Sequence, residues 1–344
     1  MFSGVMMIKI VLLSFCIILL GLFAVNITAQ EQTKQPEKKN KVEQNEKGEK
    51  ISPPVLNSVK LIYQPGHVYH YTYVDSTKVL RTYSDSSRLE YTRYIKYYLK
   101  QRAYKEAKSG DLEVETNIDS TDYKFTSGEY TLEYNSKNRK MQLQFPDLLA
   151  SIHPENRTFV TRYSSNWEVS DIFSPDLEYW RDYVVKYGEG QDTMVKFIFL
   201  NALSLTNLAQ IADFQKGALP NGRVAKDSVW IKPYTMKIDG IDCKDNEAKS
   251  HIVSVDSKET VVETTLSTIS ATPQTMRLYN INLFANILGA MGSGKQTLHI
   301  TRRGVCTESK STFDVVLKAQ VNKEVFTEKV KSGYTWTFIS EYEY

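Results

Sequence analysis

The stretch Leu61–Val74, LIYQPGHVYHYTYV, decides the fold class of this chain. It predicts a short strand, a turn at Pro65-Gly66 and a second strand. Side chains alternate between the two faces of a strand, so Tyr69, Tyr71 and Tyr73 share one face and form an aromatic stripe. Aromatic residues favour a pleated, half-buried surface, and Pro-Gly is typical of a turn. We therefore expect a β-rich protein built around this stripe.

The same alternation occurs in two parts of the chain, which we predict to be a first β region at 58–145 and a second at 221–344. Segments such as Arg88–Tyr104 are much longer than the usual strand of about 5–6 residues. The predicted fold class is therefore mainly β, a β-rich α+β fold. It would consist of long curved antiparallel sheets or open half-barrels in two β regions around a central helical segment.

That central segment, residues 146–220, carries helix signals. Ser174-Pro175-Asp176 provides an N-cap, a proline at the first helical position and an early acid, and predicts a helix ending near residues 188–190. A second helix is expected at Asp192–Phe214, where apolar residues recur at three- and four-residue steps. This helix is apolar on most sides, which predicts burial in the core, while polar residues such as Lys196 argue against a membrane span.

Residues 1–29 have the order of a secretory signal. Lys9 precedes the uncharged run Ile10–Val25, and Thr28-Ala29 supplies a small-residue exit. We expect cleavage after Ala29, with an uncleaved anchor as the alternative, because the apolar run could extend toward the roughly 20 residues of a span. Residues 30–57 are mostly Gln, Glu, Lys and Asn and predict a disordered charged linker. The mature protein would be periplasmic or secreted, with outer-membrane association as a further alternative.

The composition excludes one class of partner and suggests a covalent link. The formal net charge of the 344-residue chain is +3, and its acids and bases are interspersed, so no footprint for nucleic acid is present. If the signal carries Cys16 away, Cys243 and Cys306 remain. An even number of cysteines in an exported protein favours a disulfide between them, and two separate buried thiols are the alternative.

Motifs for catalysis, cofactors and metals give no usable match. The glycine-rich segment Gly289–Gln296 approaches the phosphate-binding loop, but Gln296 stands where a Ser or Thr hydroxyl should hold magnesium, and an alternating strand pattern follows. We interpret it as a flexible turn and predict no nucleotide site. His67 and His70 are three residues apart in a predicted strand, so they point to opposite faces and cannot share a metal. No catalytic, cofactor-binding or metal-binding residues are predicted.

Two short motifs carry a family resemblance. They are Pro65-Gly66-x-x-Tyr69-x-Tyr71 and the combination of Leu219-Pro220, Val224, Asp227 and Trp230, behind a leader ending in Thr-Ala-Gln. Over the chain from Leu61 onward, the sequence resembles a family of uncharacterised exported β-rich proteins of Bacteroidota-type bacteria. The resemblance implies export and β structure. It implies no activity and no site residues.

The segment Tyr334–Tyr344 raises an alternative architecture. Its even positions are nearly all aromatic and its odd positions mostly polar, a pattern that is similar to the terminal strand of outer-membrane β-barrels. In such a barrel the aromatic face would meet lipid. A soluble sheet that packs the same stripe on its own core is the simpler interpretation.

The sequence therefore favours an exported binding or structural module. The tyrosine face formed by Tyr69, Tyr71 and Tyr73 is the candidate surface for an apolar or glycan ligand, because tyrosine combines a flat apolar ring with a polar tip. Partners beyond a lipid or glycan ligand are unknown. An integral outer-membrane β-barrel is one alternative, and an enzyme without a recognisable motif is the second.

Overall fold

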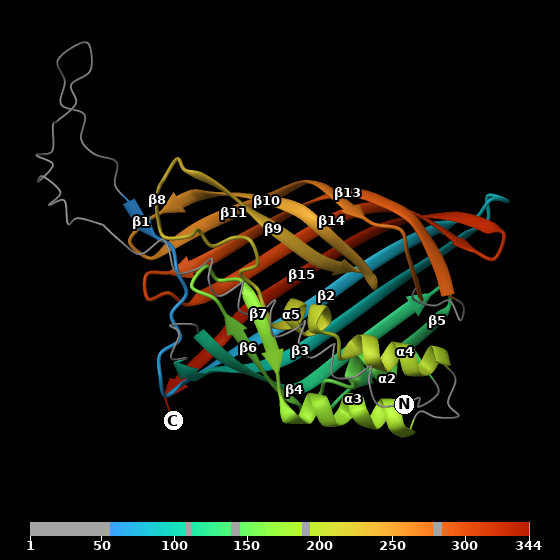
Figure 1. Ribbon diagram of the computed structural model, residues 1–344, viewed down its shortest axis with the longest axis horizontal. Helices are drawn as coiled ribbons and strands as arrows, with labels where there is room; N and C mark the ends of the chain where they lie inside the picture. Colours follow the sequence, from blue (N-terminus) through green and yellow to red (C-terminus); the bar gives the residue numbers. More distant parts are fainter. Residues whose placement is uncertain (1–55, 107–111, 139–144, 188–192, 278–283, 344) are drawn as a thin grey trace, which may run out of the picture. The chain divides into compact units, whose positions relative to one another are not determined.

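The computed structural model describes residues 56–343 apart from 107–111, 139–144, 188–192 and 278–283. The predicted signal at 1–29 and the linker up to residue 55 lie outside the described residues. In the described part, thirteen strands join in one antiparallel sheet, and β1 (Leu56–Ser58) pairs with β8 (Arg223–Ala225) in a second, two-stranded sheet. The predicted fold class is confirmed: the protein is mainly β, with long curved antiparallel strands around a helical segment (Figure 1).

The strands of the large sheet run up to 20 residues in length. In chain order they are β2 (His67–Thr82), β3 (Arg88–Glu106), β4 (Leu112–Ser127), β5 (Tyr130–Asn135), β6 (Thr158–Tyr163), β7 (Val169–Phe173), β9 (Val229–Ile238), β10 (Ile241–Val255), β11 (Glu259–Ala271), β12 (Gln274–Arg277), β13 (Phe284–Thr301), β14 (Cys306–Val321) and β15 (Glu324–Glu343).

The order of strands across the sheet is β7-β6-β4-β3-β2-β15-β14-β13-β11-β10-β9, with β5 also on β4 and β12 also on β13. The two predicted β regions are therefore halves of one sheet, because β2 pairs with β15 along nearly its whole length. The path ends at β7 and β9, which do not pair with each other, so the described sheet is not closed into a barrel.

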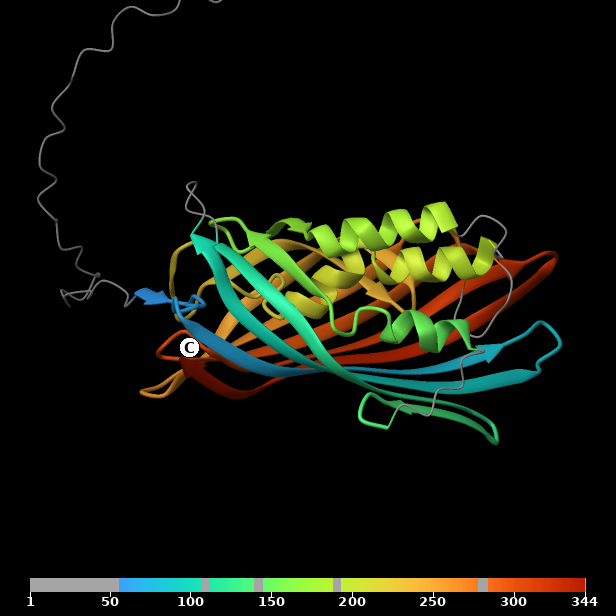
Figure 2. The same cartoon turned by 90° about the horizontal axis from the view of Figure 1, so that it is seen from below.

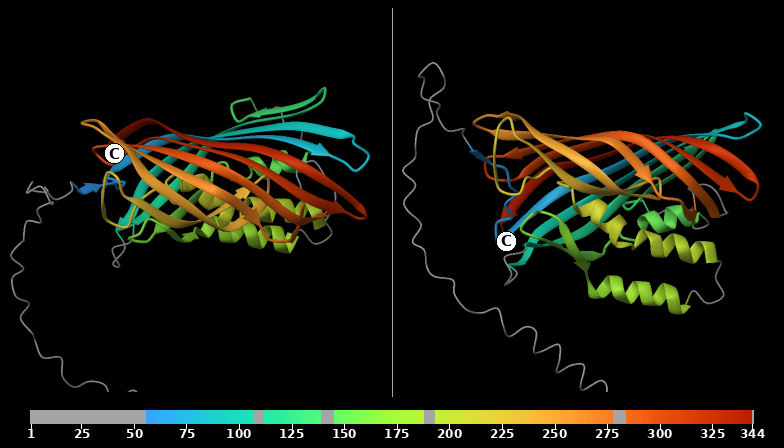
Figure 3. Two further views of the ribbon diagram at one scale, coloured as in Figure 1. Left: turned by 90° about the horizontal axis from the view of Figure 1, so that it is seen from above. Right: turned by 45° about the horizontal axis from the view of Figure 1, so that its top comes forward.

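In the described part of the chain, four helices lie on the inner, concave side of this sheet (Figures 2 and 3). They are α2 (Pro146–Ile152), α3 (Pro175–Tyr187), α4 (Thr193–Ala202) and α5 (Leu205–Ala212). The helix predicted after Ser174 is present as α3. The single helix predicted at Asp192–Phe214 is wrong, because Ser204 has an extended backbone and its hydroxyl accepts the Asn207 N–H as the N-cap of α5.

Sequence periodicity missed two strands in the same region. Strands β6 and β7 lie within residues 146–220, where only helix signals were recognised, and they extend the sheet beyond β4. The bent pair of helical segments Val195–Ala202 and Leu205–Ala212 has the length and apolar composition of a membrane span, whereas no single described helix does.

The opening stretch is only partly as predicted. Residues 59–64 form no strand, and the Ile62 N–H donates to the Gly304 carbonyl in the loop before β14. Gly66 turns the chain with a φ of 78°, and β2 begins immediately afterwards. The tyrosine stripe itself faces inward: Tyr69, Tyr71 and Tyr73 are between 1% and 3% exposed.

The C-terminal stripe meets the opening one inside the sheet. In β15, Trp336 lies directly opposite Tyr73, with ring centroids 4.8 Å apart. Tyr334 and Trp336 are buried in the core and contact protein. For Tyr334 and Trp336, the lipid-facing orientation that a barrel interpretation predicts is therefore wrong.

The predicted disulfide between Cys243 and Cys306 is absent, and both residues are buried free thiols. Cys243 lies in β10 and Cys306 in β14, with β11 and β13 between them. Three strand spacings amount to about 14 Å, twice the Cα separation that a disulfide can bridge. Burial raises the pKa of Cys243 to about 12, which keeps this thiol protonated.

The flexible turn predicted at Gly289–Gln296 is also wrong, because these residues form the middle of β13. The glycines permit close packing instead. A Cβ at Gly292 would lie 2.3 Å from the Asp314 carbonyl oxygen, and one at Gly294 would lie 2.4 Å from the Phe313 ring. Gln296 is buried, and its amide donates to the Phe214 carbonyl at 2.7 Å.

Candidate functional site

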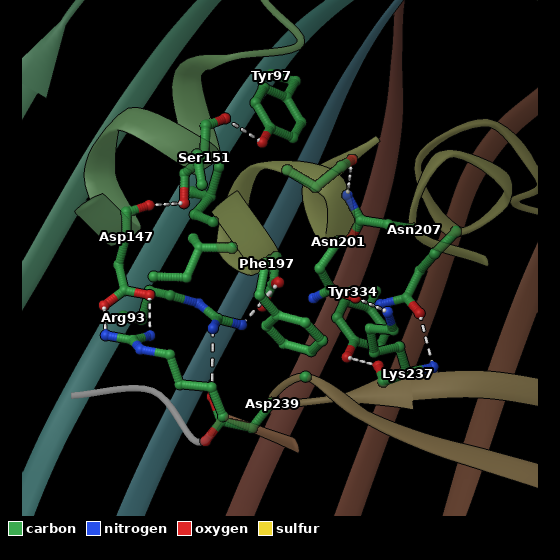
Figure 4. Close-up of a pocket in the computed structure, with 18 residues that line it drawn as sticks. Arg93, Tyr97, Asp147, Ser151, Phe197, Asn201, Asn207, Lys237, Asp239 and Tyr334 are labelled. Atoms are coloured by element: carbon green, nitrogen blue, oxygen red, sulfur yellow. Dashed lines mark hydrogen bonds and ion pairs between the residues drawn. The ribbon is translucent and has the colours of Figure 1, made fainter. Parts of the chain in front are cut away.

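A polar pocket lies between the helices and the concave face of the sheet (Figure 4). Its volume is about 130 Å³. Helices α2, α4 and α5 form one wall, and strands β2, β3, β9, β12 and β15 form the other. We call it the cover pocket, because it lies beneath the helices that cover the sheet.

Arg93 is the central cation of this pocket. It extends from β3 on the same face as Tyr91 and Ile95, and only 8% of it is exposed. Its guanidinium donates to Asp75 at 3.1 Å and to Asp239 at 3.2 Å. Asp239 and Gly240 form the two-residue turn between β9 and β10, and both have a positive φ, which is the hairpin geometry that Asp-Gly favours. The turn thereby places the Asp239 carboxylate against Arg93.

A second ion pair connects the sheet to α2. Arg277 in β12 donates to both carboxylate oxygens of Asp147, at 2.5 and 2.7 Å. Both side chains are buried. A two-bonded arginine–carboxylate pair is strong and directional, so it defines the position of α2 relative to the sheet.

Lys237 provides the third cation and connects β9 to α4. Its ammonium donates to the Asn201 side-chain oxygen at 2.7 Å and lies 3.7 Å from Asp242. Its carbonyl accepts the Tyr334 hydroxyl at 2.8 Å. The side chains that line the pocket thus include three cations and three carboxylates, Asp75, Asp147 and Asp239, and the formal charge of the wall is zero.

Aromatic and amide side chains complete the wall. The Tyr97 hydroxyl donates to the Ser151 carbonyl at 2.6 Å, and the Phe197 ring comes from α4 (Figure 4). Asn207 and Gln210 on α5 bring side-chain amides to the same space. Aromatic faces next to amides and paired charges form a surface that can both stack on a ring and exchange hydrogen bonds with it.

Burial dominates the protonation of two pocket carboxylates, Asp75 and Asp147. It raises the pKa of Asp75 although Arg93 and the Thr77 hydroxyl act in the opposite direction. It also raises the pKa of Asp147 against the effect of Arg277. Each carboxylate therefore depends on its arginine to remain charged in a site removed from water. Among the described residues, no group of three or more His, Cys, Asp or Glu side chains is arranged to hold a metal ion.

The predicted ligand face lies beside this pocket and is not its lining. Tyr73 stacks on two lining rings, Tyr97 at 5.9 Å and Tyr334 at 6.3 Å between centroids. Tyr71 contacts Phe214, and the hydroxyl of Tyr69 accepts the Gln64 N–H. The three tyrosines pack on protein in this conformation, so ligand binding by them stays a prediction.

Sequence reasoning did not select the charged lining residues. Arg93 gave the clearest signal, because an arginine on the core-facing side of a strand requires a buried partner. Asp239-Gly240 was detectable as a hairpin turn. Nothing in the sequence indicated that Asp147 and Arg277 would meet, since 130 residues separate them.

No protein-family model matches the chain, and no curated protein does. Three of the solved structures that are similar to this chain illustrate the low level of identity. The first is lipovitellin, in a structure of its lipid–protein interactions, with 11% identity and a TM-score of 0.41 over 82% of this chain and 26% of that chain. The second is Neisserial surface protein A, NspA, with 9% identity and a TM-score of 0.18 over 79% of this chain and 99% of that chain. The third is the P. putida toluene transporter TodX, with 6% identity and a TM-score of 0.17 over 82% of this chain and 91% of that chain. The chain spans about a quarter of the lipovitellin chain that it matches. Similarity at these levels carries no argument about function.

Proposed function

We propose that this protein is an exported ligand-binding protein, and that the cover pocket holds one sugar ring of a glycan. The wall of the pocket carries the proposal. Its three cations and three carboxylates sum to zero charge, which disfavours an ion and favours an uncharged polar ligand.

The chemistry of the lining fits hydroxyl groups. A sugar hydroxyl both donates and accepts, so it can donate to a carboxylate such as Asp75 while it accepts from an amide such as Asn207. Tyr97 and Phe197 offer ring surfaces to the apolar face of the sugar. A purely apolar ligand would leave these buried polar groups without a hydrogen-bonding substitute for water, which makes it the weaker candidate for this pocket.

The size of the pocket limits the ligand. At about 130 Å³ it is smaller than the roughly 300–1,000 Å³ of sites for drug-sized molecules. A single ring, or the end ring of a longer glycan, suits this volume. The tyrosine stripe would then act indirectly, because Tyr73 supports the two lining rings Tyr97 and Tyr334.

The test is calorimetric titration of the purified protein with glucose, N-acetylglucosamine and short oligosaccharides of each. We expect saturable binding by at least one of them. Ala202→Phe should abolish it, because Ala202 is a half-buried lining residue of α4 and a phenyl ring there occupies the pocket. Asn207→Ala is a milder variant that should weaken binding while the fold persists, as checked by thermal unfolding.

Ala209→Phe is the matched control. Ala209 is also half-buried and helical, but it lies on α5 outside the cover pocket. Binding should survive this change. The proposal fails if none of the sugars binds, or if Ala202→Phe and Ala209→Phe reduce sugar binding equally.

A further inference from the structure

A second pocket lies where the two ends of the strand path face each other. Its volume is about 340 Å³, within the range of small-molecule sites. The lining comes from the turn before β7 and β7 itself, from α5 with the residues that follow it, and from β9. Because α5 packs on both end strands, β7 and β9, we call this space the seam pocket.

The inner end of the seam pocket is polar and buried. Asp213 is 5% exposed, and its Oδ1 has no hydrogen-bond partner among the described residues. The Lys216 ammonium donates to the Thr235 carbonyl at 2.7 Å, and the Lys232 ammonium donates to the Asn166 carbonyl. An ammonium group has three N–H donors, so both lysines keep donors that a ligand can use.

Apolar side chains form a large part of the remaining wall. It includes Trp167, Val169, Ile172, Leu205 and Ala209. Trp167 has a φ of 62°, a left-handed conformation that costs free energy in a bulky residue. The β6–β7 turn thus holds a large ring beside the pocket at an energetic cost, and unfavourable backbone of this kind is concentrated at binding sites.

The buried charges are unequal. Asp213 faces both lysines, yet burial raises its pKa to about 7, so this carboxyl is only about half ionised at neutral pH. Glu168 and Asp171 are exposed acids that also line the pocket, and Asp171 lies 3.6 Å from Arg162. Burial also lowers the pKa of Lys216 and that of Lys232. Two ammonium groups nevertheless face one carboxyl group at the inner end, whereas Glu168 and Asp171 are exposed to solvent.

We propose that the seam pocket binds an amphiphile with an anionic head group, such as a medium-chain carboxylate. The head would accept hydrogen bonds from Lys216 and Lys232. The chain would lie against Trp167, Leu205 and Ala209. This site is separate from the cover pocket and does not depend on the sugar ligand proposed there.

The test is titration of the purified protein with decanoate at concentrations where it is monomeric, followed by calorimetry and tryptophan fluorescence. Decanol supplies the same chain without the anion, and acetate supplies the anion without the chain. We expect saturable binding of decanoate, at least tenfold weaker binding of decanol, and no detectable binding of acetate. Equal affinity for decanoate and decanol would overturn the proposal, as would no binding of either.

Variants locate the ligand. Ala209→Phe should reduce decanoate affinity at least tenfold by filling the pocket, whereas Ala202→Phe, which fills the cover pocket, should leave it unchanged. Lys232→Met keeps most of the side-chain volume and should reduce the preference for decanoate over decanol. Decanoate binding that persists in both Ala209→Phe and Lys232→Met would place the ligand elsewhere and refute the assignment.

The pH dependence and the source of the ligand give two further readouts. Decanoate affinity should fall as the pH rises through about 7, because ionised Asp213 repels the head group, and Asp213→Asn should remove this dependence. If decanoate affinity depends on pH in Asp213→Asn as it does in the unchanged protein, the placement of the head group is contradicted.

Vesicles containing phosphatidylglycerol offer the same chemistry in a membrane. Sedimentation of the protein with these vesicles that is lost in Ala209→Phe would identify a lipid surface as the source of the anion.

Discussion

Arg277 in β12 and Asp147 in α2 form a two-bonded ion pair that connects the sheet to its helical cover across 130 residues of chain. Both side chains are almost fully buried, at 8% and 5% exposure. The position of the helices over the cover pocket therefore depends on a long-range polar contact as well as on apolar packing.

Breaking this pair should be costly. We expect Arg277→Met to lower the free energy of unfolding by about 3–5 kcal/mol, because it leaves the Asp147 carboxylate buried without its partner. The double variant Arg277→Met with Asp147→Leu should recover most of that loss, since no unpaired charge remains. Urea denaturation of the two single variants and the double variant measures the coupling. Simple addition of the two single losses would contradict the account.

The tyrosine stripe should matter for stability. Tyr71 is 2% exposed and contacts Phe214 and Phe338, so Tyr71→Ala should lower the free energy of unfolding by about 3–5 kcal/mol. Tyr94 lies on the outer face of β3 with 38% exposed and provides the control. Tyr94→Ala should cost about 1 kcal/mol or less, which is usual for surface positions. Thermal and urea unfolding of both variants measures the two losses in the free energy of unfolding. Similar losses in Tyr71→Ala and Tyr94→Ala would show that the stripe does not stabilise the core.

The sequence predicts the face of each long strand better than the pairing between strands. Alternation in β2 and β15 correctly placed Tyr71 and Tyr73 on one face, because the two-residue period is a local property. The pairing of β2 with β15 connects residues such as Tyr73 and Trp336, and no local pattern encodes a contact at that separation. The two β regions were consequently recognised, whereas their union in one sheet was not.

Protonation of Asp213 should make stability depend on pH. Its folded pKa of about 7 is raised from 3.8, so its favourable contribution is complete at pH values below 3.8 and is lost as the pH rises through 7. Asp213→Asn should raise the free energy of unfolding by about 1–2 kcal/mol at pH 5 and by up to about 4 kcal/mol at pH 8. Thermal unfolding of the variant and the unchanged protein at pH 5 and pH 8 measures this effect. The charged neighbours Lys216, Lys232 and Glu168 are the same in both proteins. A variant that is destabilised at pH 8 would disprove the raised pKa.

The glycines of β13 provide a matched pair of substitutions. A Cβ at Gly292 would meet the Asp314 backbone oxygen at 2.3 Å, whereas one at Gly289 meets nothing within 4 Å. Gly292→Ala should therefore cost about 1–3 kcal/mol through overpacking, and Gly289→Ala should be close to neutral. The urea concentrations at the unfolding midpoints of the two variants test this difference in stability. If Gly292→Ala is tolerated as well as Gly289→Ala, β13 and β14 do not approach as closely as described.

The candidate site was harder to predict than the fold because its residues come from eight elements. Lys237 and Asn201 meet only after β9 and α4 have packed together. Short polar residues such as Asp147 look like ordinary surface or capping positions in the sequence, so their burial is a tertiary result. Local signals can also conflict with each other. Ser204 carries a local capping signal, but the continuous apolar pattern around it predicted one helix instead of two.

The pairing of β2 with β15 has a consequence for the order of events in the cell. In the described chain, strand pairing joins the half of the sheet from β2 to β7 to the half from β9 to β14 only through β15. The 20-residue β15, which follows every other described strand in the chain, therefore occupies the centre of the sheet. A nascent chain without it would leave β2 and β14 as open edges, which are sites of aggregation. The sheet therefore cannot be completed before β15 has been synthesised, although every other described strand precedes β15 in the chain.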